Sequence, residues 1–181
     1  MEKLPLIING VLENLSDNID TDLIIKSEHL DISDPEYWAE HVLEVVDETI
    51  PRRLKENKMN KKSTVIFAGK NFGSGSSREM AVDALKAAGI SAIIAESFNN
   101  TFYRNAINNG LLVILNSDLT DKFPNGTKIS LLADEKQTIL SINNVTYNLH
   151  PVEKFLLKRV IQGGLLPELK KEIIDLGLDK D

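Results

Sequence analysis

The sequence of 181 residues contains no cysteine. Disulfides, a thiol nucleophile and any zinc or iron–sulfur site held by thiolates of this chain are therefore excluded. Histidine is also scarce, and none of the three residues belongs to an H-x-x-x-H or H-x-x-E-H pattern. We therefore expect no metal site on this chain alone. The histidines are His29, His41 and His150.

Long apolar runs are missing as well. No stretch approaches the ~20 apolar residues that span a bilayer, and the first residues, MEKLPLIING, lack the apolar region and cleavage site of a signal peptide. Positive charge is in deficit, because 27 acidic and 21 basic residues give a net charge of −6. Broad electrostatic binding to nucleic acid or to an anionic membrane is not expected, and we predict a cytoplasmic protein.

The remaining composition is that of an ordinary globular protein, with 42% hydrophobic and 27% charged residues. A chain of this length suits one domain and can bury a sizeable core. We expect a single domain over residues 1–181, with a core over about residues 7–165 and a helical C-terminal extension over 166–181.

The stretch from residue 63 to residue 115 predicts a βαβ unit and one more strand. Residues 63–69 (STVIFAG) are a β-branched and aromatic run closed by glycine, residues 80–88 carry apolar side chains at helical spacing, and residues 92–95 are a second apolar run. A helix over 99–110 and a buried strand over 111–115 follow. We therefore expect an α/β fold with a mixed, mainly parallel sheet. Further expected elements are a strand over 128–132, a hairpin of 138–142 with 145–149, and a helix over 153–163.

The loop KNFGSGSSRE, between the first of these strands and its helix, predicts an anion site. Gly73 and Gly75 relieve backbone restrictions just before Ser76, Ser77 and Arg78, which we expect to open the helix. A helix start offers unpaired N–H groups and partial positive charge, and a guanidinium can hold a carboxylate or phosphate with two hydrogen bonds. The loop lacks the lysine of a phosphate-binding loop and the third glycine of a dinucleotide loop. It therefore suits a carboxylate.

Ser76 has two interpretations. A serine beside helix N–H groups and Arg78 can act as a base, because these groups would stabilise its alkoxide. The pattern Ser76-x-x-Glu79 also matches a capping box, in which Ser76 only caps the helix and Glu79 reaches back. The local sequence leaves both interpretations open.

Residues 4–25 predict two short strands, with residues 6–8 in the first and 23–25 in the second, around a polar turn. The turn carries Asp17, Asp20 and Asp22. These carboxylates can bind a cation, orient a histidine of a partner, or cap turns through hydrogen bonds to the backbone. The turn-capping interpretation is the most economical one, because aspartate is common at such positions.

The segment from residue 26 to residue 62 is more polar. Residues 35–46 predict an amphipathic helix with Pro35 in its first turn and Asp34 or Ser33 as its cap. The basic stretch over residues 51–62 predicts a solvated face or a linker, with docking to an acidic patch of a partner as the alternative.

These motifs together resemble a known family. The run GKNFGSGSSRE with the A…AL…AGI…IIA.SF…F.RNA.N.GL pattern, and DNIDTDLII upstream, resemble the small subunits of 3-isopropylmalate dehydratases and, more widely, the swivelling β/β/α domain of the aconitase superfamily. The resemblance covers about residues 7–165. It implies a hydro-lyase subunit that is active only with a large subunit, in a heterodimer or heterotetramer. The large subunit's cysteines would hold a [4Fe–4S] cluster, and the absence of cysteine here fits that division.

The resemblance also implies roles for matching residues. Ser76 would be the base that takes a carbon-bound proton, and Asp22 would orient an acid group of the large subunit. Arg78, with neighbouring groups of the loop, would bind a carboxylate of a small dicarboxylate substrate. A loop just after the Asp22 motif would shape the pocket for the variable substituent. The residues expected to contact substrate are Gly75, Ser77, Arg78, His29, Leu30, Asp31 and Ile32.

Three positions depart from the family pattern. His29 stands where relatives carry tyrosine, Asp31 stands at the discriminating position, and Met80 stands where histidine is common. Because Asp31 would repel an additional carboxylate, we expect a substituted malate, with isomerisation of 3-isopropylmalate and 2-isopropylmalate in leucine biosynthesis as the first candidate. Alternatives are another alkylmalate, such as 2,3-dimethylmalate or citramalate, a homoaconitase-type substrate, and a non-catalytic anion-binding module.

Overall fold

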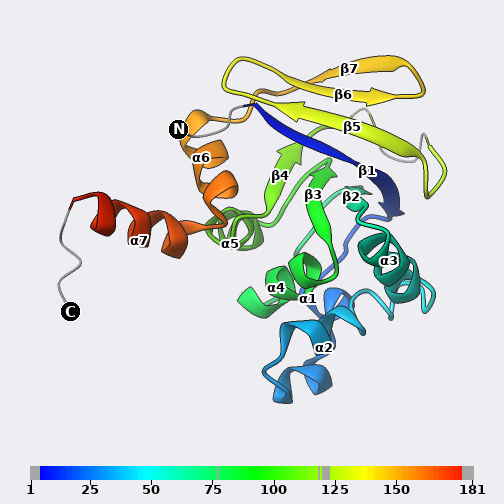
Figure 1. Cartoon of the computed structure of the whole chain (residues 1–181). Coiled ribbons are helices and arrows are strands. Elements are labelled where there is room, and N and C mark those ends of the chain that lie inside the picture. The colour runs from blue at the N-terminus through cyan, green and yellow to red at the C-terminus, as the bar shows by residue number, and fades with distance from the viewer. Residues whose placement is uncertain (1–4, 77, 118, 120–122, 177–181) are drawn as a thin grey trace.

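The computed structural model describes residues 5–76, 78–117, 119 and 123–176 (Figure 1). These residues form a seven-stranded sheet with the strand order β4-β3-β2-β1-β5-β6-β7. The strands are β1 (Leu6–Leu15), β2 (Ser63–Ala68), β3 (Ile90–Ala95), β4 (Leu112–Leu115), β5 (Lys128–Ala133), β6 (Thr138–Ile142) and β7 (Val145–Leu149). The helices are α1 (Thr21–Ile24), the 3₁₀ helix η1 (Ser27–Asp31), α2 (Pro35–Ala39), α3 (Ile50–Met59), α4 (Glu79–Ala87), α5 (Asn100–Asn108), α6 (Lys154–Gln162) and α7 (Leu165–Asp175).

Strand β1 divides the sheet into two halves. It pairs with β2 in parallel on one side and with β5 in antiparallel on the other. The pairs β2–β3 and β3–β4 are parallel, whereas β5–β6 and β6–β7 are antiparallel. The expected mixed sheet is confirmed. Within the described residues, however, parallel and antiparallel pairings are equal in number, because β5, β6 and β7 follow one another by short connections that only antiparallel strands allow.

The parallel strands are buried on both faces. In β2, Ile66 and Ala68 pack into a core with helices α1 to α5, while Val65 and Phe67 pack into a second core with the antiparallel strands and α6. Figure 1 shows these two layers on opposite sides of the parallel strands. This double burial explains why β2 is a continuous apolar run and not an alternating one.

The structure corrects three local expectations. The predicted second strand over residues 23–25 is wrong, because Asp20 caps the short helix α1 there. The predicted helix over residues 35–46 ends at Ala39, and Leu43 beyond it has a φ of +61° with its N–H donating to Ile24 O. The linker interpretation of the basic stretch is wrong, because most of it is the helix α3, whereas its basic side chains other than Arg53 are exposed, as expected for a solvated face.

The later elements follow the sequence closely. The βαβ unit, α5, β4 and α6 lie where they are expected, and Asn143 and Asn144 make the turn of the predicted hairpin with φ of +50° and +65°. Helix α7 covers most of the predicted terminal extension, of which residues 177–181 lie outside the described residues. The division into a core and an extension stays a prediction. No helix among the described residues is long and apolar enough to cross a membrane.

A partly buried ion pair links helix α3 to β1, the strand between the two halves of the sheet. Glu13 of β1 is only 2% exposed, and its carboxylate accepts hydrogen bonds from Arg53 Nη2 at 2.5 Å and Nε at 3.2 Å. Asn125, in the turn before β5, donates to the same carboxylate at 3.0 Å. Arg53 belongs to the basic stretch, so part of that stretch faces inward and not toward solvent.

Candidate functional site

Two loops that lie far apart in the sequence run side by side after the carboxyl ends of β1 and β2. We call residues 17–22 and 69–76 the paired loops. The N–H of Asn18 donates to Lys70 O at 2.8 Å, that of Gly73 to Ile19 O at 2.7 Å, and that of Thr21 to Ser74 O at 2.8 Å. Parallel strands bring their carboxyl ends to one edge of the sheet, which places the two motifs together.

Two glycines of the second loop are required by its close contacts, with helix α5 at Gly73 and with the first loop at Gly75. Gly73 has a φ of +75°, and a Cβ there would lie 2.1 Å from Phe102 Cγ. Gly75 has a φ of +93° and faces Thr21, whose Oγ1 would lie 3.1 Å from an added Cβ. The loop can therefore follow this path only with small residues at these positions.

The Ser76 hydroxyl is held by a threonine of the other loop. Ser76 Oγ lies 3.1 Å from Thr21 Oγ1, and the Ser76 N–H donates to the same oxygen at 3.2 Å. Thr21 is 1% exposed, whereas Ser76 is exposed. A buried residue therefore fixes a hydroxyl that remains open to a ligand or a partner. Sequence reasoning missed Thr21, although it stands in the centre of the Asp-Thr-Asp motif.

The capping-box interpretation of Ser76 is wrong. Helix α4 begins at Glu79, and its N-cap is Arg78, which makes no side-chain capping hydrogen bond. The Glu79 carboxylate instead accepts a hydrogen bond from Asn109 Nδ2 at 2.9 Å. The expectation that Ser76 opens the helix is therefore wrong. Its side chain makes no capping hydrogen bond to α4.

Of the three carboxylates in the first loop, two accept hydrogen bonds from backbone N–H groups. Asp17 accepts a hydrogen bond from the Lys70 N–H at 2.8 Å, and Asp20 accepts from the N–H groups of Asp22 and Leu23, each at 2.9 Å. These contacts agree with the turn-capping interpretation. Asp22 differs, because its carboxylate faces other side chains.

Asp22 and Arg78 form an ion pair between the two motifs. The Arg78 Nη1 group contacts Asp22 Oδ1, and Ser27 Oγ donates to the same oxygen at 3.1 Å. The Asp22 side chain is 59% exposed and that of Arg78 is 25% exposed. Ser77, predicted to bind substrate, lies outside the described residues. The structure thus brings Ser76, Arg78 and Asp22 together around Thr21 and the start of α4.

The side chains of residues 29–32, which are predicted to contact the variable substituent of the substrate, do not all face the same way. These residues lie in η1 and just after it, and the Trp38 Nε1–H donates to the backbone oxygens of His29 at 3.1 Å and Ile32 at 2.7 Å. The Leu30 side chain packs against the core, whereas Asp31 and Ile32 are exposed. The His29 ring is turned into the protein and is 11% exposed. Only two of the four predicted side chains therefore face outward.

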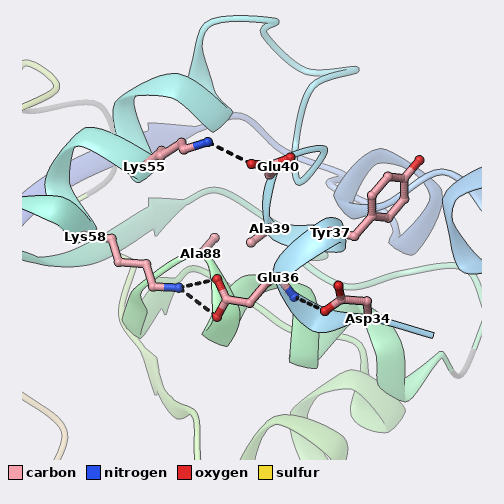
Figure 2. A pocket seen from close by; sticks show the side chains of 8 residues that line it. All are labelled: Asp34, Glu36, Tyr37, Ala39, Glu40, Lys55, Lys58 and Ala88. Carbon is pink, nitrogen blue, oxygen red and sulfur yellow. Dashed lines mark hydrogen bonds and ion pairs between the residues drawn. The ribbon is translucent and has the colours of Figure 1, made fainter. Parts of the chain in front are cut away.

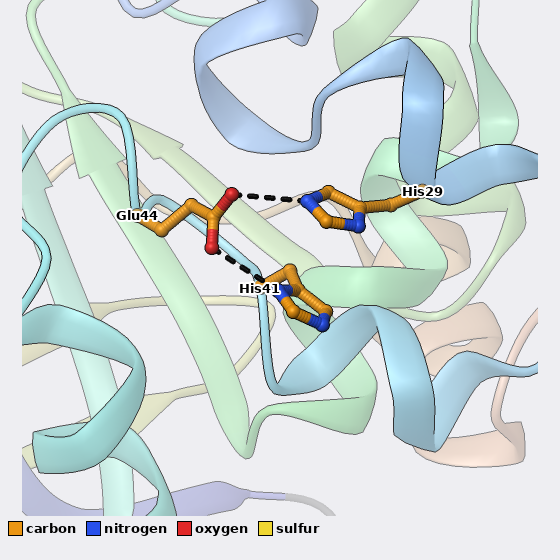
Figure 3. A group of neighbouring side chains, drawn as sticks. All are labelled: His29, His41 and Glu44. Carbon is orange, nitrogen blue, oxygen red and sulfur yellow. Dashed lines mark hydrogen bonds and ion pairs between the residues drawn. The ribbon is translucent and has the colours of Figure 1, made fainter.

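The His29 ring belongs to a cluster with His41 and Glu44 (Figure 3). His29 Nε2 lies 3.0 Å from Glu44 Oε1, and His41 Nδ1 lies 3.1 Å from Glu44 Oε2. Burial raises the pKa of the Glu44 carboxyl, but hydrogen bonds from both histidines and from Lys26 outweigh it and lower the pKa to about 2. The expectation that this chain alone has no metal site was based on the spacing of histidines along the sequence. That spacing does not reveal this group of side chains.

A pocket of about 350 Å³ lies between α2 and α3 (Figure 2). Lys58 Nζ lies 2.6 Å from Glu36 Oε2, and Lys55 Nζ lies 2.7 Å from Glu40 Oε1, at its walls. All four side chains are more than 40% exposed, so these pairs add little stability. Neither Ser76 nor Arg78 lines this pocket.

Comparison with known proteins gives a consistent result. The family model of the aconitase C-terminal domain matches residues 5–118, which include both paired loops. The crystal structure of 3-isopropylmalate dehydratase from Methanocaldococcus jannaschii superposes with a TM-score of 0.83 at 36% identity, covering 97% of this chain and 100% of that one.

Relatives of known name align over most of their length. The 3-isopropylmalate dehydratase small subunit of Aliarcobacter butzleri is 42% identical over 167 residues, 92% of this chain and 96% of the relative. The methanogen homoaconitase small subunit of Methanocaldococcus jannaschii is 39% identical over 166 residues, 92% of this chain and 93% of the relative. The chain therefore belongs to the aconitase C-terminal domain family and, within it, to the hydro-lyase small subunits of the 3-isopropylmalate dehydratase type.

Proposed function

We propose that this chain is the small subunit of a hydro-lyase that isomerises 3-isopropylmalate and 2-isopropylmalate through an unsaturated diacid. The observation that carries the proposal is the Ser76 hydroxyl, exposed but held by buried Thr21 beside the Asp22–Arg78 pair. A hydroxyl, a guanidinium and a carboxylate on one surface are the groups that proton removal next to a carboxylate requires.

Ser76 is the proposed base. Its deprotonated Oγ takes the proton from the carbon next to a substrate carboxylate, and the electron pair of that C–H bond moves onto the carboxylate. When the hydroxyl leaves as water, this pair forms the carbon–carbon double bond. The Thr21 hydroxyl, 3.1 Å from Ser76 Oγ, stabilises the charged oxygen by donating to it.

Arg78 is the proposed carboxylate ligand. Its contact with Asp22 uses Nη1, which leaves the Nε and Nη2 edge of the planar group for two parallel hydrogen bonds to a substrate carboxylate. The charge that this carboxylate gains during proton removal lies close to the guanidinium. Arg78 therefore binds the substrate and also lowers the energy of the transition state.

The leaving hydroxyl needs an acid, which we assign to the large subunit. Without cysteine this chain cannot bind a thiolate-held cluster, so in our proposal the [4Fe–4S] cluster, a Lewis acid for the departing hydroxyl, belongs to the large subunit. Asp22 would orient an acid group of that subunit through Oδ2, since its known contacts use Oδ1. Location in the cytoplasm and the stoichiometry of the complex stay predictions.

Asp31 and Ile32 are the proposed selectors of the substituent, because both are exposed. Ile32, 47% exposed, offers an apolar contact for an alkyl group. Asp31 repels a third carboxylate, which disfavours a homoaconitase-type substrate. The homoaconitase relative keeps that substrate as the second candidate, since overall identity to the two kinds of relative is similar.

The test is an assay of the complex with its large subunit, prepared without oxygen, against 3-isopropylmalate, 2,3-dimethylmalate, citramalate and homoaconitate. We expect turnover of 3-isopropylmalate, and a loss of about 10²- to 10⁴-fold in kcat with Ser76→Ala. Ser16→Ala, which removes an exposed hydroxyl near the other loop, is the matched control.

Near-normal turnover by Ser76→Ala would contradict the base assignment. Preference for homoaconitate would show that Asp31 does not repel a third carboxylate of the substrate. A complex that assembles but turns over none of the four acids would favour the non-catalytic anion-binding module.

A further inference from the structure

We propose that His29, His41 and Glu44 bind a divalent transition metal of the zinc type, through His29 Nε2, His41 Nδ1 and the Glu44 carboxylate. These side chains come from η1 and from the turn that follows α2, and their ligand atoms lie within 4.8 Å of one another (Figure 3). This site is separate from the Ser76 chemistry and does not depend on the proposed function.

The ligand atoms lie close enough to reach one such ion after one histidine ring has tilted. Nitrogen and oxygen ligands at about 2.0–2.2 Å from tetrahedral zinc lie roughly 3.3–3.6 Å from one another. Each histidine nitrogen is already 3.0 or 3.1 Å from a Glu44 oxygen. Two imidazoles with one carboxylate are also a donor set that zinc accepts, with water completing the coordination.

His29 has the outer partner that metal-bound histidines use. Its Nδ1 lies 3.2 Å from the Tyr37 hydroxyl. When Nδ1–H donates to Tyr37, the lone pair of Nε2 is free to face the metal. Trp38 holds the backbone of the same residue through its indole N–H, so the ring starts from a fixed position.

The group that competes with the metal is Lys26. Its Nζ lies 3.0 Å from Glu44 Oε1 and 3.4 Å from Glu28 Oε1, and the side chain is 42% exposed. The ammonium can therefore move into solvent, toward Glu28, when a cation reaches Glu44. Removing the Lys26 charge should strengthen metal binding, an effect that a purely structural hydrogen-bonded cluster does not predict.

Metal binding also requires that one of the two imidazole rings change its orientation. The two imidazoles are stacked, with centroids 3.9 Å apart and planes at 14°. A metal lies in the plane of each imidazole that binds it, so two nearly parallel rings cannot both face one ion. His41, whose side chain is 29% exposed against 11% for His29, has more room to tilt. The metal would then link η1 to the turn at Glu44 and fix the loop that carries Asp31 and Ile32.

The experiment is titration of the full chain, freed of metal with a chelator, with Zn²⁺ by calorimetry and with Co²⁺ by visible absorption. We expect one equivalent to bind, a rise in Tm with Zn²⁺, and none of these effects with Mg²⁺. Tyr37→Phe should weaken binding about 10- to 100-fold, and His41→Ala should weaken it at least as much. Lys26→Met should strengthen it.

His150→Ala is the control, because it removes the third histidine from an exposed position outside the cluster. Glu44→Gln keeps the size of the side chain and one acceptor oxygen, so it separates the loss of a ligand from the loss of the fold. The absence of stoichiometric Zn²⁺ binding by the unaltered chain would overturn the proposal. Equal affinity of the unaltered chain, Glu44→Gln and His150→Ala would overturn it as well.

Discussion

The two halves of the sheet contain similar strands but very different connections. In the half formed by β1 to β4, long connections leave the carboxyl ends of parallel strands, and two of them become the paired loops. In the half formed by β5 to β7, the connection between β6 and β7 is the Asn143-Asn144 turn. Parallel strands need crossovers, whose loops meet at one edge, whereas antiparallel neighbours need only tight turns. The candidate site therefore lies in the parallel half.

The largest effect is expected at β1, the strand that lies between the two halves. Arg53→Met leaves the Glu13 carboxylate buried without its cation, and removing one partner of a buried pair costs about 3–5 kcal/mol in the free energy of unfolding. The measurement is urea denaturation followed by circular dichroism. Arg52→Met on the same helix, with a side chain 76% exposed, should change stability by less than about 0.5 kcal/mol. Similar losses from both variants would show that the Glu13–Arg53 pair does not stabilise the fold more than an exposed arginine does.

The next prediction compares the loss of stability caused by a glycine substitution in a loop of each half. Gly73→Ala combines a left-handed backbone with a clash against Phe102, so it should cost about 2–5 kcal/mol. Gly126→Ala, before β5, has a similar φ of +81° but nothing within 4 Å of an added Cβ, so it should cost only about 1–2 kcal/mol. Thermal and urea unfolding give both values. Equal costs would mean that the close approach to Phe102 does not constrain the paired loops.

The smallest effect concerns the contact between the loops. Thr21→Val keeps the shape of the side chain but loses the oxygen that holds Ser76. Because this hydrogen bond is donated to a charged oxygen, its loss should lower kcat about 10- to 100-fold in the complex with the large subunit. KM should change little, because Thr21 is buried and does not face the substrate. Thr21→Ser should restore kcat, and a normal kcat in Thr21→Val would remove Thr21 from the site.

Much of the fold could be predicted from local patterns. The apolar run of β2, the helical spacing of α4 and the asparagine pair of the β6–β7 turn each act over a few residues, so sequence alone locates them. Errors arose where a tertiary contact decided the outcome. The run at residues 23–25 has strand-like composition, but Asp20 caps a helix there, and the helix begun at Pro35 ends early near a left-handed Leu43.

In the candidate site, too, some residues could be predicted from local motifs and others could not. Ser76, Arg78 and Asp22 could be predicted from the sequence because they lie in recognisable motifs, and the structure places them near one another. Sequence reasoning missed Thr21, whose partner is 55 residues away, and it gave no sign of the His29–His41–Glu44 cluster. It also assigned His29 to the substrate pocket, whereas the ring points toward Glu44.

The sequence by itself determined the α/β class, the family and the kinds of chemical group available, because periodicity and motifs are properties of neighbouring residues. Only the tertiary structure decided which groups meet. The hydrogen bonds between the paired loops place Thr21 under Ser76, and the early end of α2 turns the chain so that His41 stacks on His29. Such contacts depend on the path of the backbone through space, which no local pattern records.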